Sequence, residues 1–202
     1  FTLQTLPAAD FPRMETAAGL GEEIKLPQKT LKRLLQLVQF AMASQDIRYY
    51  LNGMLLVLDG KTLRVVATDG HRLSYAETSL ETESTPLREV IIPRKTVQEL
   101  VKLLSDTDEP VSLQIGANQV TIRLPHTELV SKVVDGKFPD YQRVIPQNQP
   151  RQLKANRQTV MQALQRASIL SNEKFRGVRL VMSENTLGIV CNNNEQEEAA
   201  DE

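Results

Sequence analysis

One short pattern occurs repeatedly along the chain, and this repetition restricts the possible folds more than any other feature. Residues 24–35 read IKLPQKTLKRLL and residues 90–101 read VIIPRKTVQELV, with Pro-x-Lys-Thr in common. Part of the pattern returns in residues 159–164, and residues 177–182 likewise resemble residues 53–58. Self-similarity of this kind indicates that one structural unit is built several times. We therefore expect two half-repeats that form one domain, followed by the start of a second such domain.

Each copy of the pattern predicts the same local elements. A short extended run ends at a proline, which suits the first turn of a helix because its missing N–H needs no partner there. From Leu31 to Met42, apolar residues recur at the three- and four-residue spacing of one helix face. Alternating runs such as 111–115 and 120–124 predict strands, whereas residues 79–88 are polar and are expected to form a linker. The pattern indicates an α+β fold of antiparallel sheets with amphipathic helices on one face.

The composition is that of an ordinary globular protein. Of 202 residues, 41% are hydrophobic and 24% are charged, which argues against disorder of the whole chain. No apolar run reaches the ~18 residues of a membrane span, so no membrane partner is expected. The single cysteine, Cys191, cannot form an internal disulfide, which favours a reducing compartment and a cytoplasmic location.

Charge is segregated along the chain although the formal net charge is only −1. Residues 25–44 carry four lysines and arginines and no acid, and residues 154–176 are also basic, whereas residues 195–202 contain five acids. Segregation of this kind can produce a surface that faces a polyanion. For any single cluster, ordinary solvation of a helix face is the preferred interpretation.

Sequence motifs for catalysis, metal binding and cofactor binding are absent. The sequence has no glycine-rich phosphate loop, and one cysteine with two histidines argues against a structural zinc site. Of the two histidines, His71 follows Asp69-Gly70, where a tight turn is the simpler interpretation, and His126 lies in another expected turn. We therefore predict that the protein is not an enzyme and that it needs neither a cofactor nor a metal.

Several longer motifs resemble one protein family. Residues 67–73 read ATDGHRL, residues 137–144 read KFPDYQRV and residues 170–179 read LSNEKFRGVR. Together with RYYLNG at 48–53 and LPAADFP at 6–12, they are similar to the bacterial DNA polymerase III beta subunit family, the replicative sliding clamps. The resemblance runs in order from one end of the chain to the other. It implies the DNA-clamp fold, in which repeated β-α-β-β-β units place antiparallel sheets outside and helices along an inner face.

The resemblance also implies a division into clamp domains. Residues 1–22 are expected to be the end of domain one with a connector, and residues 23–149 the whole of domain two. Domain two would contain two half-repeats, 23–78 and 89–149, and residues 150–202 would be the first half of domain three. The chain would then be a truncated fragment that does not close the native ring.

The function that the resemblance implies is that of a DNA polymerase processivity factor. Such a sliding clamp is a head-to-tail homodimer that encircles duplex DNA without reading its sequence. A groove for short linear motifs would tether the replicative polymerase, the clamp loader and repair proteins. Two alternatives are a protein-only repeat scaffold without DNA binding and a small enzyme that acts on a polyanion. The lack of an acid–base or metal constellation argues against the enzyme.

Three groups of site residues follow from the resemblance. The residues expected to bind partner peptides are Leu51, Thr68, Gly70, His71, Arg72, Leu73, Pro139 and Val144. The residues expected to contact DNA are Gln45, Arg48, Tyr49, Tyr50, Lys137 and Arg143. The residues expected at the dimer interface are Phe1, Leu3, Ile169, Leu170, Glu195, Glu197 and Glu198. Without the resemblance, a hairpin whose leucines belong to the core is the preferred interpretation, and Arg48-Tyr49-Tyr50 is equally well explained as a loop cap with buried aromatic residues.

Overall fold

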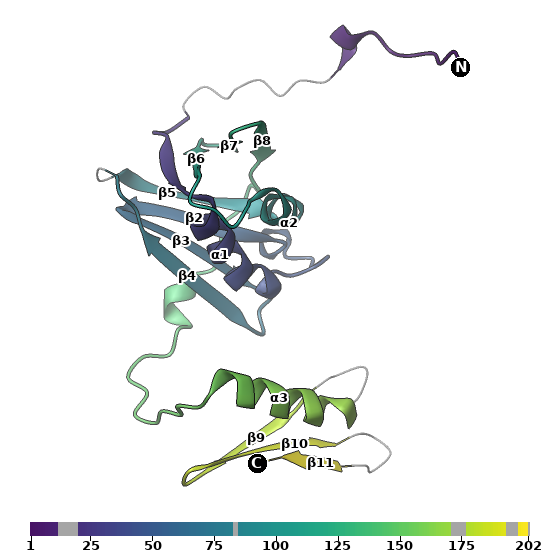
Figure 1. The fold of residues 1–202 in the computed structure, drawn as a ribbon. Helices are drawn as coiled ribbons and strands as arrows, with labels where there is room; N and C mark the ends of the chain where they lie inside the picture. The colour runs from purple at the N-terminus through teal and green to yellow at the C-terminus, as the bar shows by residue number, and fades with distance from the viewer. Residues whose placement is uncertain (12–19, 83–84, 171–176, 193–197, 202) are drawn as a thin grey trace. The chain divides into compact units, whose positions relative to one another are not determined.

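The chain forms two compact units, Phe1–Ile145 and Pro146–Glu202, each of which is described here by itself (Figure 1). Within the described residues, no helix is both long enough and apolar enough to cross a membrane. The structure, a computed structural model, describes residues 1–11, 20–82, 85–170, 177–192 and 198–201.

The first unit contains two successive β-α-β-β-β repeats. The first comprises strand β1 (Ile24–Pro27), helix α1 (Gln28–Val38) and strands β2 (Gly53–Gly60), β3 (Thr62–Thr68) and β4 (Leu73–Ser79). The backbone of Pro27 is extended, and the helix starts at the next residue, as the missing proline N–H allows. The apolar spacing continues to Met42, but the α-helix ends at Val38.

The second repeat has the same order of elements. It comprises β5 (Thr85–Pro93), α2 (Arg94–Leu103), β6 (Pro110–Ile115), β7 (Gln119–Leu124) and β8 (Thr127–Lys132). The expectation of a linker through residue 88 was wrong at its end, because Thr85 and Arg88 already pair with β2. The predicted fold class, an α+β fold of repeated β-α-β-β-β units, is confirmed.

The two repeats of this unit exchange their first strands. The sheets are β1-β6-β7-β8 and β4-β3-β2-β5, and every pairing is antiparallel. β1 therefore completes the sheet of the second repeat, with Ile24 opposite Leu113, and β5 completes the sheet of the first, with Ile92 opposite Met54. Neither sheet is complete without a strand from the other repeat.

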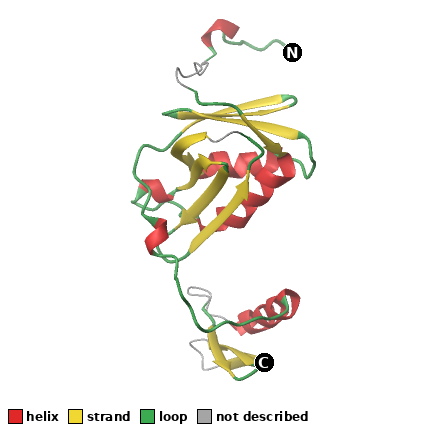
Figure 2. Ribbon diagram, turned by 90° about the vertical axis from the view of Figure 1, so that its left-hand side faces the viewer, coloured by secondary structure: helices red, strands yellow, loops and turns green. Residues whose placement is uncertain are grey.

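The main core lies between the two helices and the inner faces of both sheets. α1 and α2 are in contact, and Figure 2 shows the helices packed against the strands. The apolar face of α1 contributes Leu31, Leu35 and Val38 to this core, as its spacing predicted. Burial of such side chains contributes roughly 1.5–3 kcal/mol each, so packing stabilises these short helices.

Short 3-10 helices connect or flank the larger elements. η2 (Gln39–Ala41) continues α1, so that Met42 remains buried beyond the end of the α-helix. η3 (Tyr49–Leu51) precedes β2, and η4 (Tyr141–Arg143) lies in the loop after β8. In the N-terminal segment, η1 spans Ala8–Asp10.

The second unit follows the plan of a single repeat without its first strand. It comprises α3 (Arg157–Ala167), η5 (Ser168–Leu170), β9 (Arg179–Ser183), β10 (Thr186–Asn192) and β11 (Glu198–Asp201). The sheet order is β11-β10-β9. Its small buried cluster consists of Ala163, Ala167, Ile189 and Cys191.

Candidate partner groove and nucleic-acid surface

A tight turn between β3 and β4 holds four of the predicted groove residues. The Thr68 hydroxyl donates to the Arg72 carbonyl (2.7 Å) and accepts from the Gly70 N–H (3.0 Å). Asp69 Oδ1 accepts the backbone N–H groups of His71 (2.9 Å) and Arg72 (3.0 Å). Partial burial would raise the pKa of Asp69, but these N–H bonds lower it below its usual value. Gly70 has φ +88°, where a side chain would be strained.

Arg72 joins this turn to η2, which follows α1. Its Nε lies 3.3 Å from Asp69 Oδ2, and its Nη2 donates to the Phe40 carbonyl oxygen (2.9 Å). The guanidinium also lies 5.4 Å from the centre of the Phe40 ring, a cation–π contact. Sequence reasoning did not identify Phe40, since an exposed aromatic residue after a helix carries no distinguishing pattern.

A second hydrophobic cluster brings the separated parts of the predicted groove together. Leu51, Phe138 and Tyr141 are buried in it, and Leu73 packs against it. The Tyr141 ring lies 6.0 Å from that of Tyr75 on β4, so the loop of residues 139–144 is held beside this strand.

The predicted groove residues differ in their accessibility. Leu51 is only 1% exposed, so it supports this surface from beneath rather than lining it. Pro139 and Val144 are exposed, the latter by 64%, and Leu73 is half-buried. The structure therefore brings Leu73 and the 139–144 loop together over a buried leucine.

Arg48, predicted to contact DNA, is already held by an acid that the sequence analysis did not identify. Its Nε and Nη2 donate to the two carboxylate oxygens of Asp46 (2.9 and 2.8 Å), and its backbone N–H donates to Oδ1. Nη2 also reaches the Asp69 carbonyl oxygen (3.2 Å), which links the two loops. Chiefly through the side-chain bond from Arg48, the pKa of Asp46 falls to about 2.

Gly136, the residue before Lys137, lies beside two aromatic residues that are distant from it in sequence. The rings of Tyr49 and Tyr50 meet edge to face, with their centres 5.8 Å apart. A Cβ atom built on Gly136 would lie 3.3 Å from the Tyr49 ring, so the loop before Lys137 packs closely on this pair. Gln45, in the same loop as the tyrosines, is exposed and has φ 58°. The structure thus brings the loop that contains Gly136 and Lys137 against Tyr49 and Tyr50.

The remaining predicted DNA contact, Arg143, is paired locally. Its Nε lies 2.8 Å from Asp140 Oδ2, and both side chains are largely exposed. Among the described residues, no ion pair involves Lys137, or Lys32 and Arg33 on the outer side of α1. These three cations remain available for an external anion.

The predicted dimer residues fall on both units. Phe1, Leu3 and Ile169 are highly exposed. Glu195 and Glu197 lie outside the described residues, and only the backbone of Leu170 and Glu198 is described. Within the part of the chain that the structure covers, no group of three His, Cys, Asp or Glu side chains could hold a metal ion.

Comparison with protein families gives a match along almost the whole chain. Residues 25–140 match the family model for the DNA polymerase III beta subunit, central domain, and residues 142–202 match that for its C-terminal domain. The chain belongs to the DNA polymerase III beta subunit family. The predicted resemblance to this family is therefore confirmed.

Individual beta subunits are similar to this member of the family in sequence and in structure. The beta sliding clamp of Escherichia coli K12 is 52% identical over 199 residues, which is 98% of this chain and 54% of that protein. The clamp of Pseudomonas aeruginosa PAO1 is 46% identical over 202 residues. A crystal structure of the Pseudomonas aeruginosa subunit has a TM-score of 0.92 at 45% identity, covering all of this chain and 55% of the other. A Pseudomonas aeruginosa clamp bound to griselimycin also has a TM-score of 0.92. The chain spans about half the length of these relatives.

Proposed function

We propose that this chain contributes to a DNA polymerase processivity clamp, which binds rather than catalyses. Such a clamp is a head-to-tail homodimer in the cytoplasm that encircles duplex DNA and tethers polymerase, clamp loader and repair proteins. The observation that carries the proposal is the agreement of sequence and fold with sliding clamps along the whole chain.

The proposed partner site is the surface formed by Leu73 and the 139–144 loop. Its floor is apolar and partly buried, while His71 and Arg72 supply polar groups at its edge. Arg72 is fixed by Asp69 and Phe40, so little side-chain entropy is lost when a peptide binds against it. A short linear motif with apolar anchor residues fits this arrangement.

The proposed DNA surface is the region around Tyr49, Tyr50 and Lys137 together with the basic side of α1. Phosphate-directed charge holds DNA without selecting a sequence, which suits a protein that slides. Lys137, Lys32 and Arg33 would make these contacts, whereas phosphate would have to compete with Asp46 for Arg48 and with Asp140 for Arg143.

The partner site is tested by an amide NMR titration of the chain with a clamp-binding motif peptide, taken to millimolar concentration. We expect shifts to cluster at residues 68–73 and 139–144. Replacing Val144 by Asp should abolish them, because this side chain is exposed and its loss removes an apolar contact without disturbing the core.

Leu103→Asp serves as the matched control, since Leu103 is also an exposed apolar residue, at the end of α2. This variant should keep the wild-type shifts. Shifts that survive in Val144→Asp, or that appear only in the second unit, would contradict the proposed site.

A further inference from the structure

The loop of residues 139–144 makes no hydrogen bond or ion pair to another element within the described part of the chain. Its polar contacts are internal: Arg143 Nε pairs with Asp140 Oδ2 (2.8 Å), and the Val144 N–H donates to the Tyr141 carbonyl oxygen (3.2 Å). Tyr141 is only 8% exposed and lies in the second hydrophobic cluster. The position of Val144 therefore depends on how firmly the Tyr141 side chain is packed.

Tyr75 supplies an aromatic contact for Tyr141. It lies on β4 two residues after Leu73, so the alternation of a strand places both side chains on one face of the sheet. The rings of Tyr75 and Tyr141 have centres 6.0 Å apart and planes at 35°, within the range of favourable aromatic pairs. Val66, opposite Tyr75 on β3, is buried in the same cluster as Tyr141. The two rings therefore join β4 to the loop beside a predicted groove residue.

The Tyr75 ring is itself held by a chain of charged side chains. Its hydroxyl donates to Glu77 Oε2, and the same oxygen accepts from Arg64 Nε (3.1 Å). Arg64 Nη1 in turn lies 3.1 Å from Asp59 Oδ2. These three charged residues lie on β4, β3 and β2 in that order, so the chain crosses the sheet. The orientation of Tyr75 thus depends on residues outside the predicted groove.

The bond between Tyr75 and Glu77 does not titrate near neutral pH. Partial burial and the bond to Glu77 raise the pKa of Tyr75 to about 12. The bonds from Tyr75 and Arg64 lower the pKa of Glu77 below its usual value. The hydroxyl therefore stays a donor and the carboxylate stays a charged acceptor under the conditions of a binding experiment.

We propose that Tyr75 is a positioning residue of the partner site. Glu77 and Arg64 orient its ring, and through the ring of Tyr141 it sets the position of Val144. The inference rests on the proposed function, because it concerns how the same site is held ready for a peptide. A loop that is ordered beforehand loses less conformational entropy when the peptide binds.

Backbone ¹⁵N relaxation of the free chain tests the positioning without any peptide. We expect the heteronuclear NOE of residues 139–144 to fall in Tyr75→Ala, because the Tyr141 ring loses its neighbour. Tyr75→Phe keeps the ring and should restore most of the order. Glu128→Ala is the matched control, since Glu128 accepts from Arg123 (2.7 Å) in the other sheet of the same unit. Equal loop order in the wild type and Tyr75→Ala would overturn the proposal.

The affinity for a clamp-binding motif peptide gives a second test. Tyr75→Ala should weaken binding roughly fivefold. Glu77→Ala should weaken it by about twofold, because the ring remains but loses a hydrogen bond that orients it. Glu128→Ala should bind like the wild type. If the wild type binds at residues 68–73 and 139–144 and Tyr75→Ala binds equally well, the positioning role is wrong although the partner site stands.

A double-mutant cycle separates positioning from direct contact with the peptide. Val144→Ala shortens an exposed apolar side chain of the proposed site. If Tyr75 acts through Val144, then Tyr75→Ala should cost less affinity in the Val144→Ala background than in the wild type. Additive losses would show that Tyr75 contributes independently of this residue, and they would overturn the positioning role.

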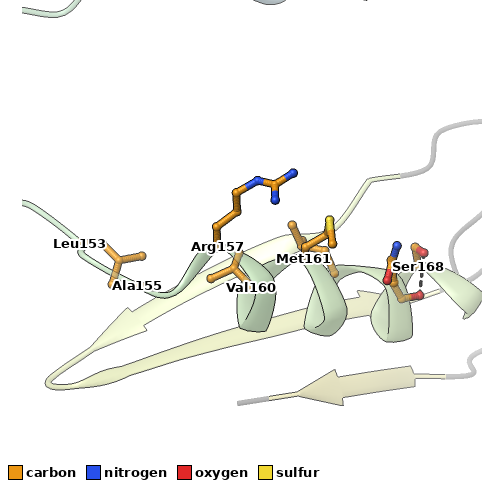
Figure 3. Close-up of a pocket in the computed structure, with 8 residues that line it drawn as sticks. Leu153, Ala155, Arg157, Val160, Met161 and Ser168 are labelled. Atoms are coloured by element: carbon orange, nitrogen blue, oxygen red, sulfur yellow. Dashed lines mark hydrogen bonds between the residues drawn. The ribbon is translucent and has the colours of Figure 1, made fainter. Parts of the chain in front are cut away.

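The titration also distinguishes failure of this inference from failure of the proposed function. The second unit offers a different apolar hollow of about 680 Å³ beside α3, lined by Leu153, Val160 and Met161 among others (Figure 3). A peptide bound there would shift residues 153–168 and would be insensitive to Tyr75→Ala. That outcome would contradict the proposed partner site itself, and with it the role of Tyr75 in binding.

Discussion

At the scale of single residues, two carboxylates order the loops of the candidate site. Asp46 holds Arg48 through both of its oxygens, and Asp69 holds Arg72 and the backbone of the turn between β3 and β4. Arg48 also donates to the Asp69 carbonyl oxygen, so the two loops are linked through Asp46, Arg48 and Asp69. Arg48, which the sequence analysis predicted to contact DNA, therefore also holds these two loops together.

The first prediction concerns the pKa of Asp46, which is about 2 instead of 3.8. Replacing Arg48 by Met removes the bonds that favour the charged carboxylate, so this pKa should return toward 3.8. A ¹³C NMR titration of the Asp46 carboxyl carbon measures it. Arg143→Met, which breaks a different ion pair, should leave the Asp46 value unchanged.

The sign of the linked stability change follows from the direction of the shift. Because the pKa is lower in the folded state, the Asp46 carboxylate favours folding above about pH 4, and this contribution is lost as pH falls toward 2. Arg48→Met should weaken the acid dependence of unfolding in that range. An Asp46 pKa that is the same in wild type and Arg48→Met would show that Arg48 is not the cause.

At the scale of elements, the three helices begin in two different ways. α1 and α2 follow Pro27 and Pro93, and neither has a side-chain cap. α3 follows Asn156, whose Oδ1 accepts the N–H groups of Gln158 (2.9 Å) and Thr159 (3.1 Å). In α1 the N–H groups of Gln28 and Lys29 instead donate to the backbone carbonyls of Glu109 and Thr107, whereas the Asn156 cap of α3 is a local feature.

Removing this cap should weaken α3. Asn156→Ala is expected to cost about 1 kcal/mol, because two N–H groups of the first turn lose their acceptor. Amide hydrogen exchange in residues 158–167 should then be faster by roughly fivefold. Asn156→Asp keeps an acceptor oxygen and should retain most of the protection. Equal exchange in the wild type and Asn156→Ala would contradict a capping role.

At the scale of the whole molecule, strand exchange is the feature that turns half-repeats into a domain. Because β1 and β5 each complete the other repeat's sheet, the core is shared and neither half has a closed sheet alone. The helices lie in contact with one another in this shared core, which leaves Lys32 and Arg33 on the outer side of α1.

Binding to duplex DNA should be weak, independent of sequence and strongly dependent on salt. The logarithm of the binding constant should fall with that of the salt concentration by about 0.9 for each phosphate neutralised. Lys137→Ala should reduce this slope by about 1, whereas Arg143→Ala should reduce it less, because Asp140 already pairs with Arg143. Fluorescence anisotropy with a labelled duplex measures both. Binding that is absent at low salt would favour the protein-only scaffold.

The sequence by itself determined the repeat, the apolar faces of the helices and the order of helices and strands along the chain. These features depend on local spacing and on proline geometry. It also carried the family resemblance through continuous motifs such as residues 67–73. The predicted linker extended too far because residues 79–88 are polar and lack the apolar alternation of a strand. Thr85 is nevertheless the first residue of β5, because it pairs with Gly60 of β2.

Only the tertiary structure decided which repeat completes which sheet, since the same extended segment could pair with either. It also decided that Leu51, predicted to bind partner peptides, is buried, that Asp46 neutralises Arg48, and that Gly136 packs against Tyr49 and Tyr50. These facts join residues far apart in the chain or depend on the direction of a side chain. Local spacing carries no information about such contacts, because they arise when separate elements pack around a shared core.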